Sequence, residues 1–216
     1  MKIKAKIILG IITLTCFHSL GQDSQLFKLW PDSVLAAANS ARTAHYLNEE
    51  EKSLIFYTNL VRINPDLFST TYFEEYLEKN DIKKDKEIKK LIQDLEFYER
   101  MEILKPSQQL SEIATKHAKD MGNSGRTGHL SNNGDSFKKR MEEGLKIYSG
   151  INENCQYGYE KGIDILMDLL IDRDVPNYGH RKNILDPGMK YVGVAIEPHK
   201  RWNVNCVQDF GGEAIR

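Results

Sequence analysis

The stretch NYGHRKNILDPG, residues 177–188, is the part of the sequence around which the rest of the chain is organised. It follows a strongly apolar run and precedes a β-rich tail. The pair Gly179-His180 stands directly before a short helix-like segment, residues 181–185. A glycine at the entry to a helix exposes the side chain that comes after it. His180 is therefore the first candidate for a functional residue.

Length and composition indicate a soluble globular protein. The 216 residues fit one domain with an appended helical segment and can bury a sizeable core. The mean hydropathy is −0.51, and 28% of the residues are charged.

The amino terminus has the pattern of a signal peptide. Three lysines precede an apolar run, residues 7–17, which is too short to span a bilayer, and small residues stand at positions 19 and 21. We expect residues 1–21 to be removed and the protein to be secreted or periplasmic. A buried amino-terminal helix is one alternative. Lipoprotein anchoring at Cys16 is another, which the bulky Thr15 disfavours.

Removal of residues 1–21 takes away three of the 30 basic residues and none of the 31 acidic ones, which leaves a net charge near −4. A chain with this charge attracts neither nucleic acid nor an anionic membrane. We expect a monomer without a transmembrane anchor in the mature chain. The ligand or protein partner stays open.

Two cysteines, Cys155 and Cys206, remain in the mature chain. In an exported protein a pair of cysteines favours one disulfide. Two buried free thiols are the alternative.

Helix signals divide the middle of the chain. Asn48 and Glu51 have the spacing of a capping box, and apolar residues at helical spacing follow as far as Asn64-Pro65. The next expected elements are helices over residues 33–46, 107–121, 137–143 and 161–171, a loop over 148–158, and strands over 191–196 and 202–210. The lysine cluster at residues 83–90 is interleaved with acids, which is typical of a solvated helical face.

Four residues could form a site. His129 and His180 each follow a glycine, and neither belongs to an H-E-x-x-H motif. Asp172 ends a helix, where the macrodipole disfavours an acid, so a nearby cation would explain it; a solvated acid is the alternative. Glu153 lies in the expected loop. Two imidazoles and two carboxylates would suit zinc or a similar ion.

His117 lies on or beside the apolar stripe of its expected helix. A lone histidine in such a position is more often a satisfied core residue than a ligand.

The order of several short motifs resembles that of the CAP superfamily, the cysteine-rich secretory, antigen-five and plant pathogenesis-related proteins and their bacterial relatives. The resemblance runs from about residue 48 to residue 212, and the bacterial branch is the most similar. The motifs are HAKDM (117–121), GHL (128–130), Phe137 with Arg140, INEN (151–154), LLIDRDVPNYGHRKNILDP (169–187), YVGVAI (191–196) and VQDFG (207–211).

The resemblance implies an α+β fold, an α-β-α sandwich with a small, largely antiparallel sheet between helical layers. It also implies a cleft with two histidines and two acids that binds a divalent metal, such as zinc, in some members. By position these are His129, Glu153, His180 and Asp172. Asp172 stands where the family commonly has glutamate, so its shorter arm would reach an ion through water.

The expected domain organisation is a signal peptide over 1–21, an accessory helical segment over 22–47, a CAP domain over 48–212 and a tail over 213–216. Catalysis is not a general property of this superfamily, so a secreted binding or interaction module is the favoured function. A metal-assisted hydrolase with Glu153 or Asp172 as general base is the second hypothesis. A hydrogen-bonded tetrad with a purely structural role is the third.

Overall fold

A computed structural model describes Leu26 and residues 28–215 of the chain. The expected signal peptide and Cys16 lie outside the described residues. The elements are α2 (Asp32–Ala38), α3 (Glu49–Ile63), α4 (Pro65–Phe68), η1 (Ser69–Phe73), α5 (Glu74–Lys79), α6 (Lys86–Phe97), β1 (Lys105–Pro106), α7 (Gln108–Ser124), α8 (Phe137–Arg140), α9 (Glu142–Leu145), β2 (Ile151–Tyr157), α10 (Gly162–Ile171), η2 (Pro176–Tyr178), α11 (Gly179–Ile184), β3 (Tyr191–His199) and β4 (Asn203–Gly211).

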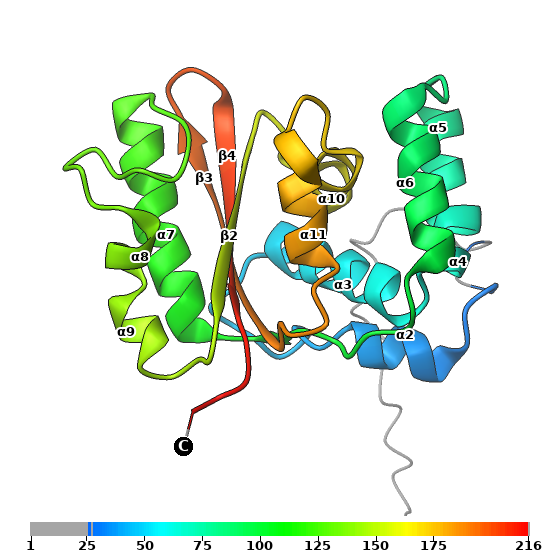
Figure 1. Ribbon diagram of the computed structural model, residues 1–216, viewed down its shortest axis with the longest axis horizontal. Coiled ribbons are helices and arrows are strands. Elements are labelled where there is room, and N and C mark those ends of the chain that lie inside the picture. Colours follow the sequence, from blue (N-terminus) through cyan, green and yellow to red (C-terminus); the bar gives the residue numbers. More distant parts are fainter. Residues whose placement is uncertain (1–25, 27, 216) are drawn as a thin grey trace, which may run out of the picture.

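The sheet has the strand order β1-β3-β4-β2. β4 pairs antiparallel with both β2 and β3, and the two residues of β1 pair parallel with β3. Helices cover both faces: α7, α8 and α9 lie on one side, and α3, α10 and α11 lie on the other, with α4 to α6 beyond them (Figure 1). The predicted α-β-α sandwich with a largely antiparallel sheet is confirmed.

Helix α7 lies unusually close to the sheet because glycines stand at both ends of the contact. A Cβ atom on Gly193 of β3 would lie 2.1 Å from the backbone of Leu110 and Ser111. A Cβ atom on Gly122 of α7 would lie 2.0 Å from the carbonyl oxygen of Pro198. Only glycine permits backbones to approach this closely.

The predicted start of α3 depends on a polar cap, and the structure confirms it. Asn48 and Glu51 form a reciprocal capping box at α3, and the hydroxyls of Ser107 and Ser136 accept from backbone amides at the starts of α7 and α8. Two extents differ. The helix expected over 33–46 is the seven-residue α2, which ends at Ala38, and the helix expected over 137–143 is broken at Met141.

The segment predicted as a loop over 148–158 contains strand β2. All of its residues pair with β4. The sequence INENCQY does not have the alternating apolar pattern of a strand, because buried polar side chains occupy positions where apolar ones are expected. Asn154 Nδ2 donates to Gln208 Oε1 at 3.4 Å, and Gln156 Nε2 donates to Asp168 Oδ2 at 3.1 Å.

The structure contradicts the predicted disulfide, because Cys155 and Cys206 are both free and buried. Cys206 is the register partner of Gln156, the residue after Cys155. Successive side chains of a strand point to opposite faces. Cys155 therefore packs with Ala114 and Ala118 of α7, whereas Cys206 belongs to the core on the other face.

Residues 28–47 share the main core. Trp30, Ala38, Ala41, Ala44 and Leu47 are buried in the same cluster as α3, α6 and α10. Among the residues that the structure describes, no helix combines the length and apolarity needed to cross a membrane.

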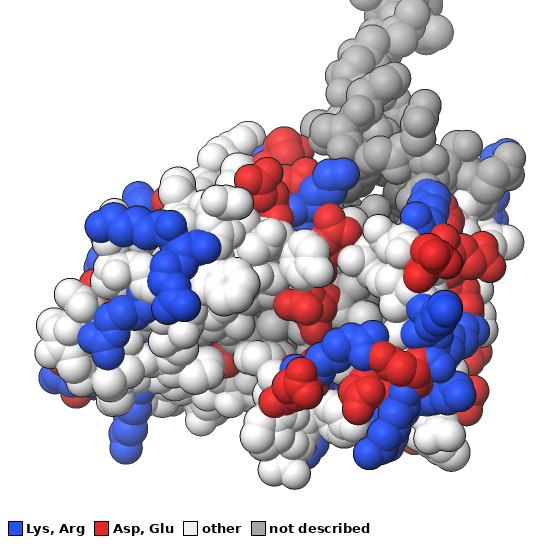
Figure 2. Space-filling model, turned by 90° about the horizontal axis from the view of Figure 1, so that it is seen from above, with Lys and Arg blue, Asp and Glu red and all other residues white. Residues whose placement is uncertain are grey.

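The charged segment around α5 and α6 forms the expected solvated face. Basic and acidic side chains are interspersed on the right of the view from above (Figure 2). Lys84 pairs with Glu74 at 2.5 Å, and Lys90 pairs with Asp94. These exposed pairs neutralise the cluster locally.

Candidate functional site

His129 and Glu153 form the first of two acid–imidazole pairs. His129 follows Gly128 in the loop after α7, and its Nδ1 lies 2.8 Å from Glu153 Oε1. The glutamate side chain is 2% exposed, whereas that of the histidine is 52% exposed. A buried carboxylate of β2 thus holds a histidine ring that remains open to solvent.

Arg140 of α8 also binds Glu153. Its Nη2 donates to Oε1 at 2.8 Å and to Oε2 at 2.6 Å, and its Nη1 donates to the carbonyl oxygen of His129 at 2.6 Å. Burial alone would raise the pKa of Glu153, but the hydrogen bonds from His129 and Arg140 bring it below its ordinary value. Glu153 is therefore a carboxylate that is already paired with a cation.

Asp209 of β4 lies opposite Glu153 in the register of the sheet. It is fully buried, and within the described chain neither of its oxygens has a hydrogen-bond donor. Burial, together with the charge of Glu153, raises the pKa of Asp209 well above its ordinary range. A protonated Asp209 can donate to Glu153, which satisfies both groups.

Asp172 and His180 form the second pair. Asp172 is the C-cap of α10, in the left-handed region at φ 58°, and its Oδ1 lies 2.8 Å from His180 Nδ1. Its Oδ2 accepts from the backbone amide of Arg181 at 3.2 Å. The partners of this helix-end acid are thus an imidazole and an amide, whereas Arg173 pairs with Asp85.

The guanidinium of Arg181 fixes α11 against α10. It is 1% exposed, donates to the carbonyls of Leu170 at 2.6 Å and Ile171 at 2.9 Å, and pairs with Asp94 of α6 at 2.7 Å. The central carbon of the Arg181 guanidinium, Cζ, lies 4.2 Å from the centroid of the Tyr178 ring. Because these carbonyls end α10, Arg181 holds in place both Asp172 and the helix that carries His180.

Arg62 of α3 anchors the other end of α11. This fully buried side chain donates to the carbonyl oxygens of Ile184 at 2.7 Å, Asp186 at 2.9 Å and Met189 at 3.0 Å. Burial lowers its pKa to about 10, so the group stays charged at neutral pH. Helix α11 is therefore anchored at both ends by arginines.

Asparagines connect the two pairs. Asn183 Nδ2 donates to the carbonyl oxygen of Glu153 at 3.2 Å and to Asn154 Oδ1 at 2.8 Å. Asn154 Nδ2 in turn donates to the carbonyl oxygen of His180 at 3.2 Å. β2 and α11 thus hold one another next to both acid–imidazole pairs.

The two histidines have the hydrogen bonding of metal ligands. In each ring Nδ1 faces a buried carboxylate. Among described residues nothing hydrogen-bonds to either Nε2; the His129 side chain is 52% exposed and that of His180 is 21% exposed. A metal-binding histidine usually uses one nitrogen for the ion and the other for a carboxylate that orients the ring. Each imidazole therefore has the hydrogen bonding expected of a metal ligand, with an acid behind it.

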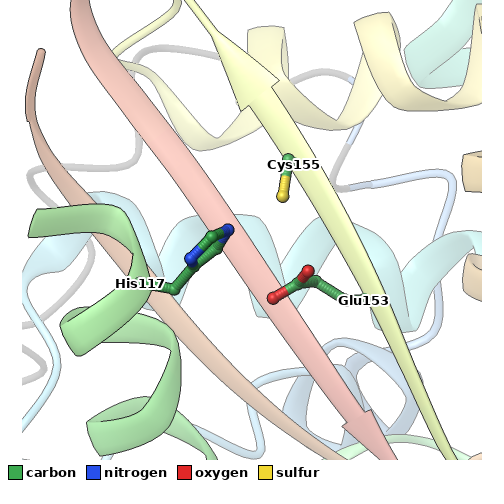
Figure 3. Close-up of side chains that lie close together, drawn as sticks. All are labelled: His117, Glu153 and Cys155. Atoms are coloured by element: carbon green, nitrogen blue, oxygen red, sulfur yellow. The ribbon is translucent and has the colours of Figure 1, made fainter. Parts of the chain in front are cut away.

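Among the described residues, a different group of three side chains lies close enough together to hold a metal ion. His117, Glu153 and Cys155 each offer a ligand atom, and these atoms lie within 4.8 Å of one another (Figure 3). Neither Asp172 nor His180 belongs to this group. His117 is 1% exposed, and its Nε2 lies 2.9 Å from the carbonyl oxygen of Gly128.

Residues 98–210 match the family described as the cysteine-rich secretory protein family, CAP. The chain belongs to this family. It is 29% identical over 90 residues to the uncharacterized membrane protein YlbC of Bacillus subtilis, an alignment that covers 42% of the CAP chain described here and 25% of that relative. The chain thus spans about a quarter of that protein's length.

Two solved structures are similar to this CAP protein. An extracellular protein containing a SCP domain from Bacillus anthracis has a TM-score of 0.45 at 24% identity, over 52% of this chain and 35% of the other. An outer surface protein from Borrelia burgdorferi has a TM-score of 0.44 at 16% identity, over 52% of this chain and 80% of the other.

Arg140 and Asp209 were not predicted as site residues, and Arg181 was expected only as one of the cations that could lie near Asp172. Arg140 and Asp209 stand within the motifs that carried the resemblance, which was the available signal. An acid inside the apolar run of the last strand also marks a buried carboxyl, since such a group must find a partner or keep its proton.

Proposed function

We propose that this CAP protein is a secreted or periplasmic binding module whose cleft holds a divalent metal, such as zinc, between Nε2 of His129 and Nε2 of His180. The observation that carries the proposal is the matched orientation of two imidazoles, each with Nδ1 on a buried acid. Glu153 and Asp172 then act through the histidines. The signal peptide over 1–21, the CAP domain over 48–212 and a monomeric state belong to the same proposal.

Zinc is the first candidate because imidazole nitrogen is among its preferred ligands. Two protein nitrogens leave coordination positions open for water or a ligand. A carboxylate or amide of a partner could fill one of them. The cleft would then recognise a partner through the ion.

The same contacts favour binding over the hydrolase alternative. A general base needs a carboxylate oxygen within reach of the attacking water. Both oxygens of Glu153 face Arg140, and those of Asp172 are taken by His180 and the amide of Arg181. A base in this cleft would first have to give up these partners.

Calorimetric zinc titration of the metal-stripped protein tests the proposal. We expect the wild type to bind one zinc ion, and His129→Ala and His180→Ala each to weaken binding at least tenfold. Glu153→Gln and Asp172→Asn should weaken it about 10- to 100-fold, since they remove orienting partners of the ligands. His45→Ala is the matched control, because His45 is exposed and outside both pairs.

Absence of zinc uptake by the wild type at neutral pH would contradict the proposal. So would equal affinities of the wild type, His129→Ala and His180→Ala. In either case, lower thermal stability of the two alanine variants would favour the structural alternative, in which the pairs only order the loops.

A further inference from the structure

We propose that His117 and Tyr157 are positioning residues that clamp the backbone of Gly128 and so fix the ring of His129. The inference deepens the proposed function and rests on it for the role of His129. The hydrogen bonds that carry it are independent of any metal.

The loop that presents His129 has few means of holding its own shape. Its sequence, GNSGRTGHLSNNG over residues 122–134, is rich in glycine. Gly128 has a φ of +98°, and a Cβ atom built there would have no neighbour within 4 Å. Gly128 contributes no side-chain packing of its own, so polar contacts restrain its backbone.

Both backbone polar atoms of Gly128, its N–H and its carbonyl oxygen, are engaged. Its N–H donates to Tyr157 Oη at 2.8 Å, and its carbonyl oxygen accepts from His117 Nε2 at 2.9 Å. The thiol of Cys155 approaches the same oxygen at 3.8 Å. The clamp therefore joins α7 and the end of β2 to the loop residue that precedes His129.

Further contacts restrain the loop on both sides of this peptide. Arg140 donates to the carbonyl oxygen of His129 at 2.6 Å and to the hydroxyl of Ser131 at 3.3 Å. His199 Nε2 lies 2.8 Å from the carbonyl oxygen of Arg126. The Tyr157 ring packs edge-on against the His199 ring at 5.4 Å.

The clamp gives the trio of His117, Glu153 and Cys155 a role that needs no metal ion. Nε2 of His117 donates to Gly128, which leaves its buried Nδ1 without a partner among the described residues, and Glu153 is already paired with Arg140. Burial raises the pKa of Cys155 well above its ordinary value, which keeps the thiol neutral. Cys155 Sγ lies 3.7 Å from His129 Nδ1, and Glu153 Oε1 lies 2.8 Å from it, so both side chains lie against that ring.

The test compares Tyr157→Phe with the wild type by NMR and calorimetry. We expect the Gly128 amide to exchange with solvent about fivefold faster, the typical effect of one lost hydrogen bond. The nuclear Overhauser contact between the His129 ring and the Cys155 β protons should weaken, and zinc affinity should fall about fivefold. His117→Leu should act likewise, whereas His117→Gln, which keeps an N–H donor, should behave more like the wild type.

Tyr148→Phe is the matched control, because it deletes a buried hydroxyl that bonds to Ser107 instead. It should change neither Gly128 exchange nor zinc affinity. Unchanged Gly128 exchange in Tyr157→Phe would overturn the inference, and so would faster exchange with unchanged zinc affinity. If the wild type binds no zinc, the proposed metal function fails, and the exchange rate and the His129–Cys155 contact alone decide the inference.

Discussion

Glu153 and Asp209 show how one buried charge is tolerated in the sheet. Arg140 and His129 satisfy the ionised Glu153. Within the described chain Asp209 has no donor of its own, so it fits the interior only with a proton attached. An isolated buried carboxylate would cost far more than a neutral carboxyl.

The raised pKa of Asp209 predicts that the free energy of unfolding decreases as the pH rises. Above the ordinary value of 3.8, the unfolded state releases this proton while the folded state keeps it. Stability therefore falls as pH rises, by about 1.4 kcal/mol per pH unit at most, until the folded pKa is passed. Asp209→Asn cannot titrate, and its Nδ2 can still donate to Glu153. We expect the variant to be more stable than the wild type at pH 7 and about equal near pH 4.

Urea denaturation at pH 4, 5, 6 and 7 checks this expectation. Asp174→Asn is the control, since Asp174 is exposed and already has positive φ, which asparagine tolerates. A constant difference between Asp209→Asn and the wild type over this range would show that Asp209 is not the titrating group.

Local sequence signals indicated His129, His180 and Asp172, and only the family resemblance indicated Glu153; no signal indicated how these residues pair. Glycine before each histidine and an acid at a helix end are local signals. Nδ1 of His129 faces Glu153 because the loop after α7 crosses β2. Nδ1 of His180 faces Asp172 because Arg181 fixes α11 against α10. These arrangements join segments far apart in the chain, and no local pattern records them.

At the level of elements, the contact between α7 and β3 sets the thickness of one half of the sandwich. Gly193→Ala places a methyl group 2.1 Å from backbone atoms of α7. The methyl group can be accommodated only if the helix moves away from the sheet. We expect a loss of about 2–3 kcal/mol in the free energy of unfolding, at the upper part of the range for overpacking. Chemical denaturation measures it.

Gly150→Ala is the matched control. A methyl group there would meet only the end of the Met189 side chain, at an ordinary 3.7 Å. Its effect should stay within about 0.5 kcal/mol. Equal stabilities of the two variants would mean that α7 can shift away from the sheet at little cost.

Helices were predictable where cap signals and apolar spacing agreed, as at the capping box of Asn48 and Glu51. β2 was not, because Asn154 and Gln156 are buried with polar partners, and burial of that kind leaves no alternating apolar pattern. The early end of α2 also has a tertiary cause. Ala41 and Ala44 reach the core from the non-helical segment that follows α2, although alanine favours a helix.

On the scale of the whole molecule, Cys155 and Cys206 belong to separate cores on the two faces of the sheet. Reducing agent therefore has no bond between them to break. We expect equal melting temperatures, within about 1 °C, with and without dithiothreitol. Alkylation after denaturation under non-reducing conditions should label both thiols.

Recovery of a peptide that joins Cys155 to Cys206 would contradict this expectation. A drop in melting temperature on reduction would do so as well. Neither cysteine has a glycine beside it, and β2 pairs with β4 along its whole length. The strands therefore have no simple way to turn one of the two side chains to the other face.

The separation of the two thiols also bears on how the chain reaches its native state. A protein stapled by a disulfide needs an oxidant and risks mispaired intermediates after every unfolding event. Between its two described cysteines this chain has no such bond to form. Recovery from denaturant should then depend on helix docking and strand pairing alone, and it needs no thiol oxidase wherever the chain folds.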